Sequence, residues 1–176
     1  MKWALVLCSL LLFQSEDPSL SWTYEEHPLL SWDDFRGVPP QSVDRAASVN
    51  SGMSYQFSKK TSNGKITDLD IKVESGFYPE LSWKLDLNES SRELLKHEQL
   101  HWDITHLFTL RLRATYKRYR PVKNVKREID FIFRKFERDR ATMQAKYDAE
   151  TNHGLNREAQ QKWEIFVNGE LLKVEI

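Results

Sequence analysis

Two long amphipathic patterns in the second half of the chain restrict its fold more than any other feature. The first begins at Ser90, which has the spacing of a helix capping box with Glu93. Its buried side is predicted to contain Leu94, His97, Leu100, His101, Ile104, Leu107, Phe108 and Leu112. Pro121 ends this helix, and a second helical pattern follows from about Lys123 to Glu150. Two such helices must bury their apolar faces in a common core.

The residues before these helices predict a small antiparallel sheet. Apolar and small side chains fall on one parity over residues 47–57, as in a half-buried strand. The turn formers of residues 61–64 lead into a second strand over 66–73, which predicts a hairpin. Residues 76–87 contain Pro79 and predict an edge segment.

The end of the chain predicts a minor closing element. Gly154 is a helix stop signal, and the residues after it predict a short helix that ends near Asn168 and Gly169, followed by a brief strand-like tail. The order of strands and then helices favours the α+β class, with the small antiparallel sheet packed against the two long helices.

The first residues of the chain have the composition of a secretion signal. Lys2 precedes the run WALVLCSLLLF, which is as long as a signal-peptide core and too short to span a bilayer. We predict a signal peptide at residues 1–15, with an uncleaved anchor as the alternative, and one exported domain at residues 16–176, periplasmic or secreted. The only cysteine, Cys8, lies in this run, so the mature chain forms no disulfide.

The charge balance removes one class of partner. Lys and Arg number 26, as do Asp and Glu, so there is no electrostatic argument for a nucleic acid or an anionic membrane surface. The basic run at residues 111–127 is interpreted as a solvated corner between helices. The sequence has no glycine-rich phosphate loop and no serine in a nucleophile elbow. Any partner must be inferred from a site.

The strongest candidate for a site is HEQLHWD, residues 97–103. His97 and His101 lie four residues apart on one helical face, where both imidazoles can reach one metal ion. Glu98 projects beside the pair and could deprotonate a water molecule. The alternative is a pair of histidines that are solvated or satisfied in the core. Both histidines fall on the apolar side of the helix, and this favours the metal site because buried imidazoles need partners.

A second polar cluster, YDAETNHG at residues 147–154, ends the second helix. It contains Asp148, Glu150 and His153, each able to supply the third ligand that a zinc site needs. The alternative is an ordinary charged helix end. Tyr147 could stabilise the oxyanion of a hydrolytic reaction, or it could simply belong to the core.

Together these residues resemble a known family. HEQLHWDIT, YDAETNHG and the pair Gln160 and Trp163, with LSWDDFRGVPP and AASVNSGMSY upstream, are similar to the bacterial domain-of-unknown-function 922 family. The resemblance implies an exported zinc-dependent peptidase with a zincin-like fold. It implies that His97 and His101 bind Zn²⁺ and that Glu98 is the general base.

We rank His153 first as the third zinc ligand and assign a catalytic role to Tyr147. Glu150 is the second choice, and Asp148 could bind zinc or orient a ligand imidazole, a role also open to Asp103. The predicted function is hydrolysis of peptide bonds in a peptide or protein substrate. The alternative is a noncatalytic binding module of the cell envelope that zinc stabilises, and a metal-free interaction protein is the third possibility.

Overall fold

The computed structural model describes residues 21–43, 45–85 and 91–174. The predicted signal peptide and the capping residue Ser90 lie outside these ranges. The described chain has an N-terminal arm, two pairs of strands and three helices in that order, which confirms the α+β class with small antiparallel sheets.

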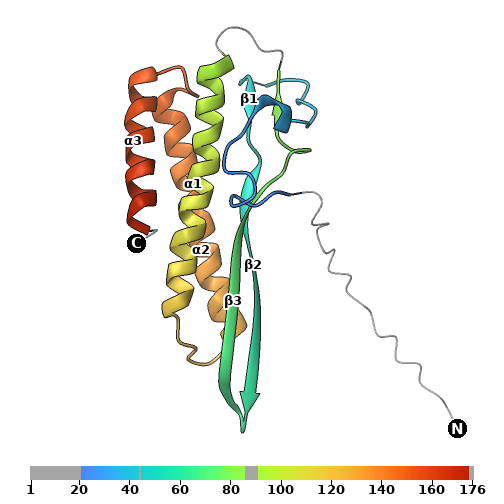
Figure 1. Cartoon of the computed structure of the whole chain (residues 1–176), viewed down its shortest axis with the longest axis vertical. Coiled ribbons are helices and arrows are strands. Elements are labelled where there is room, and N and C mark those ends of the chain that lie inside the picture. The colour runs from blue at the N-terminus through green and yellow to red at the C-terminus, as the bar shows by residue number, and fades with distance from the viewer. Residues whose placement is uncertain (1–20, 44, 86–90, 175–176) are drawn as a thin grey trace, which may run out of the picture.

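The larger strand pair is the predicted hairpin. β2 (Ser51–Ser62) and β3 (Lys65–Phe77) are antiparallel, and Asn63 and Gly64 connect them with φ angles of 51° and 73°. Two successive positive φ angles match the right-handed twist of the strands, which is why an Asn-Gly turn is favoured here. The tip of the hairpin extends past the ends of the helices (Figure 1).

The predicted strand at residues 47–57 is interrupted. Its first part, β1 (Ala47–Ser48), pairs with β4 (Trp83–Lys84) in a separate two-stranded sheet. The break occurs because two backbone N–H groups leave the ladder: Val49 donates to Glu98 and Asn50 donates to the Ser82 hydroxyl, both at 2.9 Å. The interruption therefore connects the sheet to the helix that carries Glu98.

The helices are α1 (Ser91–Arg118), α2 (Val125–Thr151) and α3 (Arg157–Val174). α1 ends before Pro121, as predicted. The Asn124 side chain caps α2 by accepting a hydrogen bond from the Arg127 N–H at 3.1 Å. α1 contacts both other helices and the strands of the hairpin.

The prediction of a short closing helix and a strand-like tail is wrong. α3 continues through Asn168 and Gly169 to Val174. Val167 and Leu171 lie on one face of α3 and pack into the core, so burial extends the helix past the glycine. A glycine inside a helix costs about 1 kcal/mol, which this packing offsets.

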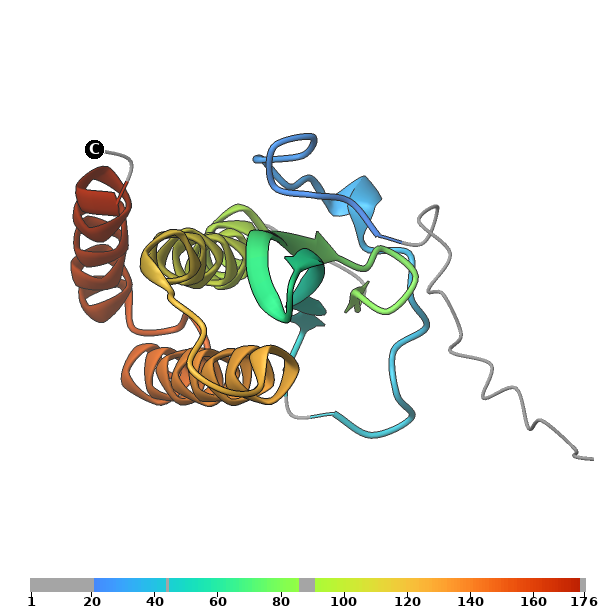
Figure 2. The ribbon, with the colours of Figure 1, turned by 90° about the horizontal axis from the view of Figure 1, so that it is seen from below.

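α1 lies at the centre of the core, and α2, α3 and the hairpin pack against it (Figures 1 and 2). Its buried members are Met53, Val73, Leu100, Ile104, Phe108, Leu112, Tyr116, Val125, Ile129, Tyr147, Trp163 and Val167. A smaller cluster joins the arm to α1: Leu30 and Phe35 pack with Phe77 and the fully buried Trp102. Among the described residues, no helix combines the length and apolar character needed to cross a lipid bilayer.

Candidate metal centre

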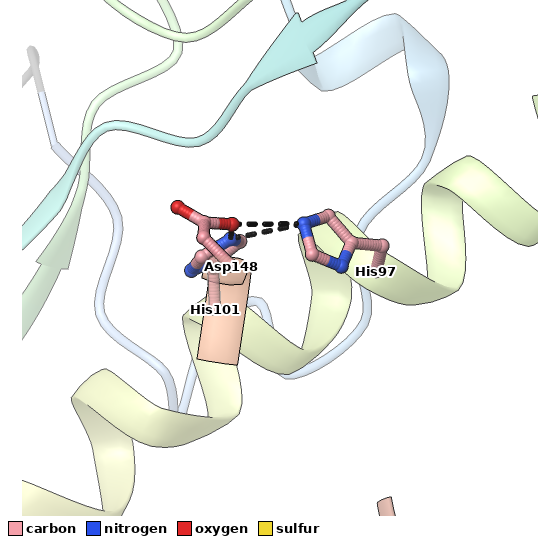
Figure 3. Close-up of side chains that lie close together, drawn as sticks. All are labelled: His97, His101 and Asp148. Atoms are coloured by element: carbon pink, nitrogen blue, oxygen red, sulfur yellow. Dashed lines mark hydrogen bonds and ion pairs between the residues drawn. The ribbon is translucent and has the colours of Figure 1, made fainter. Parts of the chain in front are cut away.

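Two histidines of α1 face one carboxylate of α2 (Figure 3). His97 Nε2 lies 3.1 Å and His101 Nε2 lies 2.9 Å from Asp148 Oδ1. The two Nε2 atoms are 3.2 Å apart. His97, His101 and Asp148 form the group of potential metal ligands among the described residues, with ligand atoms within 4.8 Å of one another.

The other ring nitrogen of His97 is held by a glutamine. His97 Nδ1 lies 3.2 Å from Gln160 Oε1, and Gln160 Nε2 donates to Glu164 Oε1 at 3.0 Å. Since Glu164 binds the amide N–H₂, the amide oxygen must face the histidine and accept a hydrogen bond from Nδ1–H. The lone pair of His97 is therefore on Nε2, which faces Asp148.

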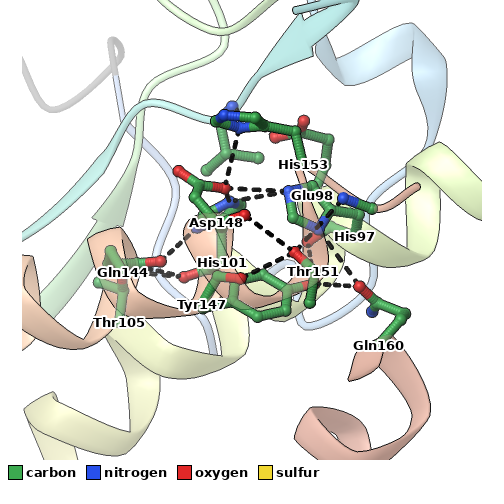
Figure 4. A network of polar contacts seen from close by, with 12 residues as sticks. His97, Glu98, His101, Thr105, Gln144, Tyr147, Asp148, Thr151, His153 and Gln160 are labelled. Atoms are coloured by element: carbon green, nitrogen blue, oxygen red, sulfur yellow. Dashed lines mark hydrogen bonds and ion pairs between the residues drawn. The ribbon is translucent and has the colours of Figure 1, made fainter. Parts of the chain in front are cut away.

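His101 has the same arrangement with a second glutamine (Figure 4). Its Nδ1 is hydrogen-bonded to Gln144 Oε1, while Gln144 Nε2 donates to the His101 carbonyl at 2.9 Å. The amide orientation is again fixed by its N–H₂ end, so Nδ1 carries the proton. Both histidines thus direct a lone pair at the same carboxylate.

Three acceptors that converge in this way need a proton or a metal ion between them, and an imidazole that is protonated on Nε2 as well donates to Asp148. Burial lowers the pKa of His101, but the hydrogen bond to Asp148 and the charges of Glu98 and Asp148 outweigh it, so this pKa is raised. Burial raises the pKa of Asp148, but its hydrogen bonds to His101 and His97 outweigh burial, so the pKa of this carboxyl lies far below its ordinary value. Two neutral imidazoles and one carboxylate are also a donor set that suits zinc.

Glu98, on α1, lies beside this group and contacts Val49, the residue that follows β1. Its side chain is buried, and Oε2 accepts the Val49 N–H at 2.9 Å. Glu98 lines the same cavity as His97 and His101. A backbone hydrogen bond to one oxygen fixes the carboxylate next to the three converging acceptors without making it part of that group.

Tyr147 lies beneath the histidines, away from the cavity. It is fully buried, and its ring stacks on His97 with centroids 4.6 Å apart. Its hydroxyl donates to Gln160 Oε1 at 2.6 Å, close to the His97 carbonyl at 3.2 Å. Burial raises its pKa far above the ordinary value. The residue predicted as an oxyanion stabiliser therefore supports the histidine and its glutamine from within the core.

The residues predicted as third ligands occupy different places. Asp148 is the one brought together with the histidine pair. His153 lies on the outer side of Asp148, with Nδ1 3.5 Å from Oδ1. Glu150 accepts a hydrogen bond from Trp163 Nε1 at 2.8 Å. Asp103 accepts from the Tyr24 hydroxyl at 2.9 Å, and so it orients the arm rather than an imidazole.

The turn after α2 has an unusual backbone. Asn152, His153 and Gly154 have successive φ angles of 48°, 53° and 83°, all in the left-handed region. A Cβ at position 154 would lie 3.0 Å from His97 Cβ and Cγ. Glycine is therefore required there both by its φ angle and by its contact with the His97 side chain. The strained turn holds His153 over the site.

The site opens into a cavity of about 900 Å³. Its walls come from the segment around β1, from α1, from α2 and from the turn that precedes α3. His97, Glu98, His101, Asp148 and His153 all line it. A cavity of this volume is large enough for a peptide segment or a small ligand.

The sequence did not predict that two glutamines, Gln144 and Gln160, hold the imidazoles of the site. Gln160 is predicted only as part of a family pattern, and no role is predicted for Gln144. The signal for Gln144 was its position four residues before Asp148, which places both on the face of α2 that meets α1. The partner of His97 lies on a third helix, so no local spacing indicates it.

The comparisons with known proteins place the chain in a family without assigning an activity. No curated protein and no solved structure matches it. A family model described as bacterial protein of unknown function (DUF922) matches residues 36–154, which include both polar clusters. This match covers more than half of the chain, so the protein belongs to the DUF922 family.

Proposed function

We propose that this protein is an exported zinc-dependent peptidase. The observation that carries the proposal is the convergence of His97, His101 and Asp148, with both distal imidazole nitrogens held by glutamine oxygens. Glu98 stands beside this group in a cavity that is large enough for a peptide segment. The residues fit a zinc ion because two lone pairs and a carboxylate meet at one point.

In this proposal His97, His101 and Asp148 hold the ion. Bound zinc supplies a Lewis acid that polarises a carbonyl group and makes water more acidic. Glu98 accepts a proton from the water whose oxygen attacks the scissile carbonyl carbon, and it returns that proton to the amine nitrogen as the C–N bond breaks. The Val49 N–H holds the Glu98 carboxylate in position for both transfers.

A zincin-like architecture belongs to the same proposal. α1 carries the histidine pair and contacts β1, whose residues line the cavity next to Glu98. We propose that an extended peptide lies along β1 and pairs with its backbone. Export rests on the apolar run near the N-terminus of the sequence, as argued above.

The second candidate is a zinc-stabilised binding module without catalysis. It is favoured by His153, because a nitrogen 3.5 Å from Asp148 could close the coordination sphere as a fourth protein ligand. A closed sphere leaves no position for water, as in structural zinc sites. The two candidates therefore differ in whether Glu98 has a task.

The test is the Glu98→Gln variant of the zinc-loaded protein. The amide keeps the shape of the carboxylate but cannot accept a proton, so zinc content should stay near one per chain while peptide turnover collapses. The substrate is a mixed pool of unstructured peptides near neutral pH, and chelator-treated protein is the blank. Glu158→Gln, at an exposed glutamate of α3 outside the cavity, is the matched control.

Equal cleavage by wild type and Glu98→Gln would remove the peptidase proposal. Zinc bound by His97, His101, Asp148 and His153 together, with no cleavage of any pool, would establish the binding module instead.

A further inference from the structure

The cavity beside the metal group also contains three arginines from three different segments. Arg45 precedes β1, Arg140 lies on α2 and Arg157 begins α3. Three carboxylates, Glu93, Glu98 and Asp148, line the same cavity. The question is which of these charged groups could bind a ligand.

The carboxylates in the same cavity are already engaged. Glu93 pairs with Lys96 at 3.1 Å, Glu98 accepts the Val49 N–H, and Asp148 faces the histidine pair. Glu98 and Asp148 lie at the proposed metal group and Glu93 pairs with a lysine, so Arg140 is the buried cation of the cavity that we consider for an anionic ligand.

Arg140 is the most buried of the three arginines. Its side chain is 14% exposed, and Nε and Nη2 donate to Glu137 Oε2 at 3.1 and 2.8 Å. Glu137 is itself fixed, because its Oε1 accepts the Met53 N–H at 3.1 Å. The guanidinium is thus held along one edge.

The opposite edge of the guanidinium remains available for a ligand. Of its five N–H groups, two bind Glu137, and within the described part of the chain Nη1 makes one long contact, 3.4 Å from Thr105 Oγ1. Nη1 and Nη2 can therefore each direct one N–H at a carboxylate, in the paired geometry that arginine favours. Burial strengthens such a contact by excluding water.

The position of Arg140 also sets a distance from the metal group. Arg140, Gln144 and Asp148 follow one another at four-residue intervals on one face of α2. Eight residues of helix span about 12 Å. An extended peptide advances about 3.3 Å per residue. A carboxylate bound by Arg140 would therefore lie within about four residues of the scissile bond.

We propose that the cavity selects substrates that carry a carboxylate within about four residues of the scissile bond, and that Arg140 binds this carboxylate. The inference rests on the proposed peptidase function for the identity of the reaction. The carboxylate could belong to an acidic side chain or to the C-terminus of the peptide, since both present the same group to the guanidinium.

The experiment uses four matched peptide pools with zinc-loaded protein. Two pools have blocked ends and contain either Glu or Gln at fixed positions. The other two contain no acidic side chain and end in either a free carboxylate or an amide. The measured quantity is the ratio of kcat/KM for each carboxylate pool to that for its neutral partner.

We expect a ratio of about 10 to 100 in wild type for one of the two pairs, the size of a paired charged hydrogen bond. Arg140→Gln should bring this ratio toward one, and Arg140→Lys, which keeps the charge but loses the fork, should give an intermediate value. Arg138→Gln, at an exposed position on α2 outside the cavity, is the matched control and should keep the wild-type ratio.

Ratios near one in wild type would overturn the inference, and so would a ratio that Arg140→Gln does not change, which would make Arg140 only a structural partner of Glu137. Failure of the proposed function is recognised separately. If no pool is cleaved, binding of the same dye-labelled pools is measured by fluorescence anisotropy. Selective binding of a carboxylate pool would retain the inference without the reaction, and equal binding of all pools would remove it.

Discussion

His97 Nδ1 and Gln160 Oε1 lie 3.2 Å apart, and this contact determines which nitrogen of His97 faces Asp148. Gln160 is buried between Tyr147, whose hydroxyl donates to it at 2.6 Å, and Glu164, to which it donates at 3.0 Å. The orientation of an α1 histidine is therefore set by a residue of α3. Helix α3 is thus part of the site, although it lines the cavity only at its first residue.

Gln160→Leu should weaken zinc binding while the fold is retained. Loss of a group that orients a ligand imidazole costs roughly 10–100-fold in metal affinity. Affinity is measured by competition with a chromogenic chelator, and folding is checked by the melting temperature of the metal-free protein. Gln161→Leu, at the exposed neighbouring position, is the control and should bind zinc like wild type. Wild-type affinity in Gln160→Leu would show that His97 is oriented without its glutamine.

The third ligand can be identified by comparing Asp148→Ala with His153→Ala. Asp148 lies 3.1 and 2.9 Å from the two Nε2 atoms, whereas His153 Nδ1 lies 3.5 Å from Asp148 Oδ1. We expect Asp148→Ala to abolish stoichiometric zinc binding and His153→Ala to weaken it by less than about 100-fold, as for a residue that orients a ligand. Glu150→Ala, which removes the partner of Trp163, is the control for charge loss at the same helix end. If His153→Ala loses zinc and Asp148→Ala keeps it, the third ligand is His153, as predicted from the sequence.

Much of the fold could be predicted from local patterns. The helices follow from apolar periodicity, and the hairpin follows from Asn63 and Gly64, which adopt the positive φ angles that their type favours. The end of α3 could not be predicted, because Gly169 is a stop signal by its type and only the packing of Val167 and Leu171 overrides it.

One part of the candidate site could also be predicted from local spacing, and the rest could not. His97 and His101 are four residues apart, so any helix places them on one face, with Glu98 beside them. The order of preference among Asp148, Glu150 and His153 depends on how far α2 continues before the chain turns. Asn152 ends α2 in the left-handed conformation, and this leaves Asp148 facing α1 and puts His153 outside the helix. Gly154 indicates that boundary in the sequence, but which of the three side chains faces the histidine pair depends on how α2 packs against α1, to which sequence periodicity gives no access.

Gly154→Ala should destabilise the protein and weaken zinc binding together. The left-handed φ of 83° disfavours alanine, and the new Cβ would lie 3.0 Å from two carbon atoms of His97. We expect a loss of about 1–3 kcal/mol in the free energy of unfolding, measured by urea denaturation. Gly169→Ala is the matched control, because nothing lies within 4 Å of its added Cβ. In the middle of α3 that substitution should stabilise the protein by about 0.5–1 kcal/mol.

His106 provides a prediction on pH that is independent of the metal group. Its ring is 7% exposed and stacks on Tyr24 with centroids 3.8 Å apart. Its Nδ1 is buried and has no hydrogen-bond partner in the part of the chain that the structure describes. Burial lowers the pKa of His106 from 6.5 to about 4, while Glu25 raises it and Arg113 lowers it further.

A lowered histidine pKa makes the folded state weaker in acid. Between pH 6.5 and about 4 the unfolded chain binds a proton at His106 that the folded chain does not, so stability falls as the pH decreases through this range. The full difference corresponds to about 3 kcal/mol.

His106→Phe keeps the stack on Tyr24 and removes the titrating group, so its unfolding free energy should depend less on pH. Urea unfolding at several pH values between 4 and 7, with excess chelator, measures both slopes. His27→Phe, at an exposed histidine that stacks on Trp22, is the control for adding an aromatic ring. Parallel curves for wild type and His106→Phe would show that the buried ring is protonated in the folded protein as readily as in the unfolded chain.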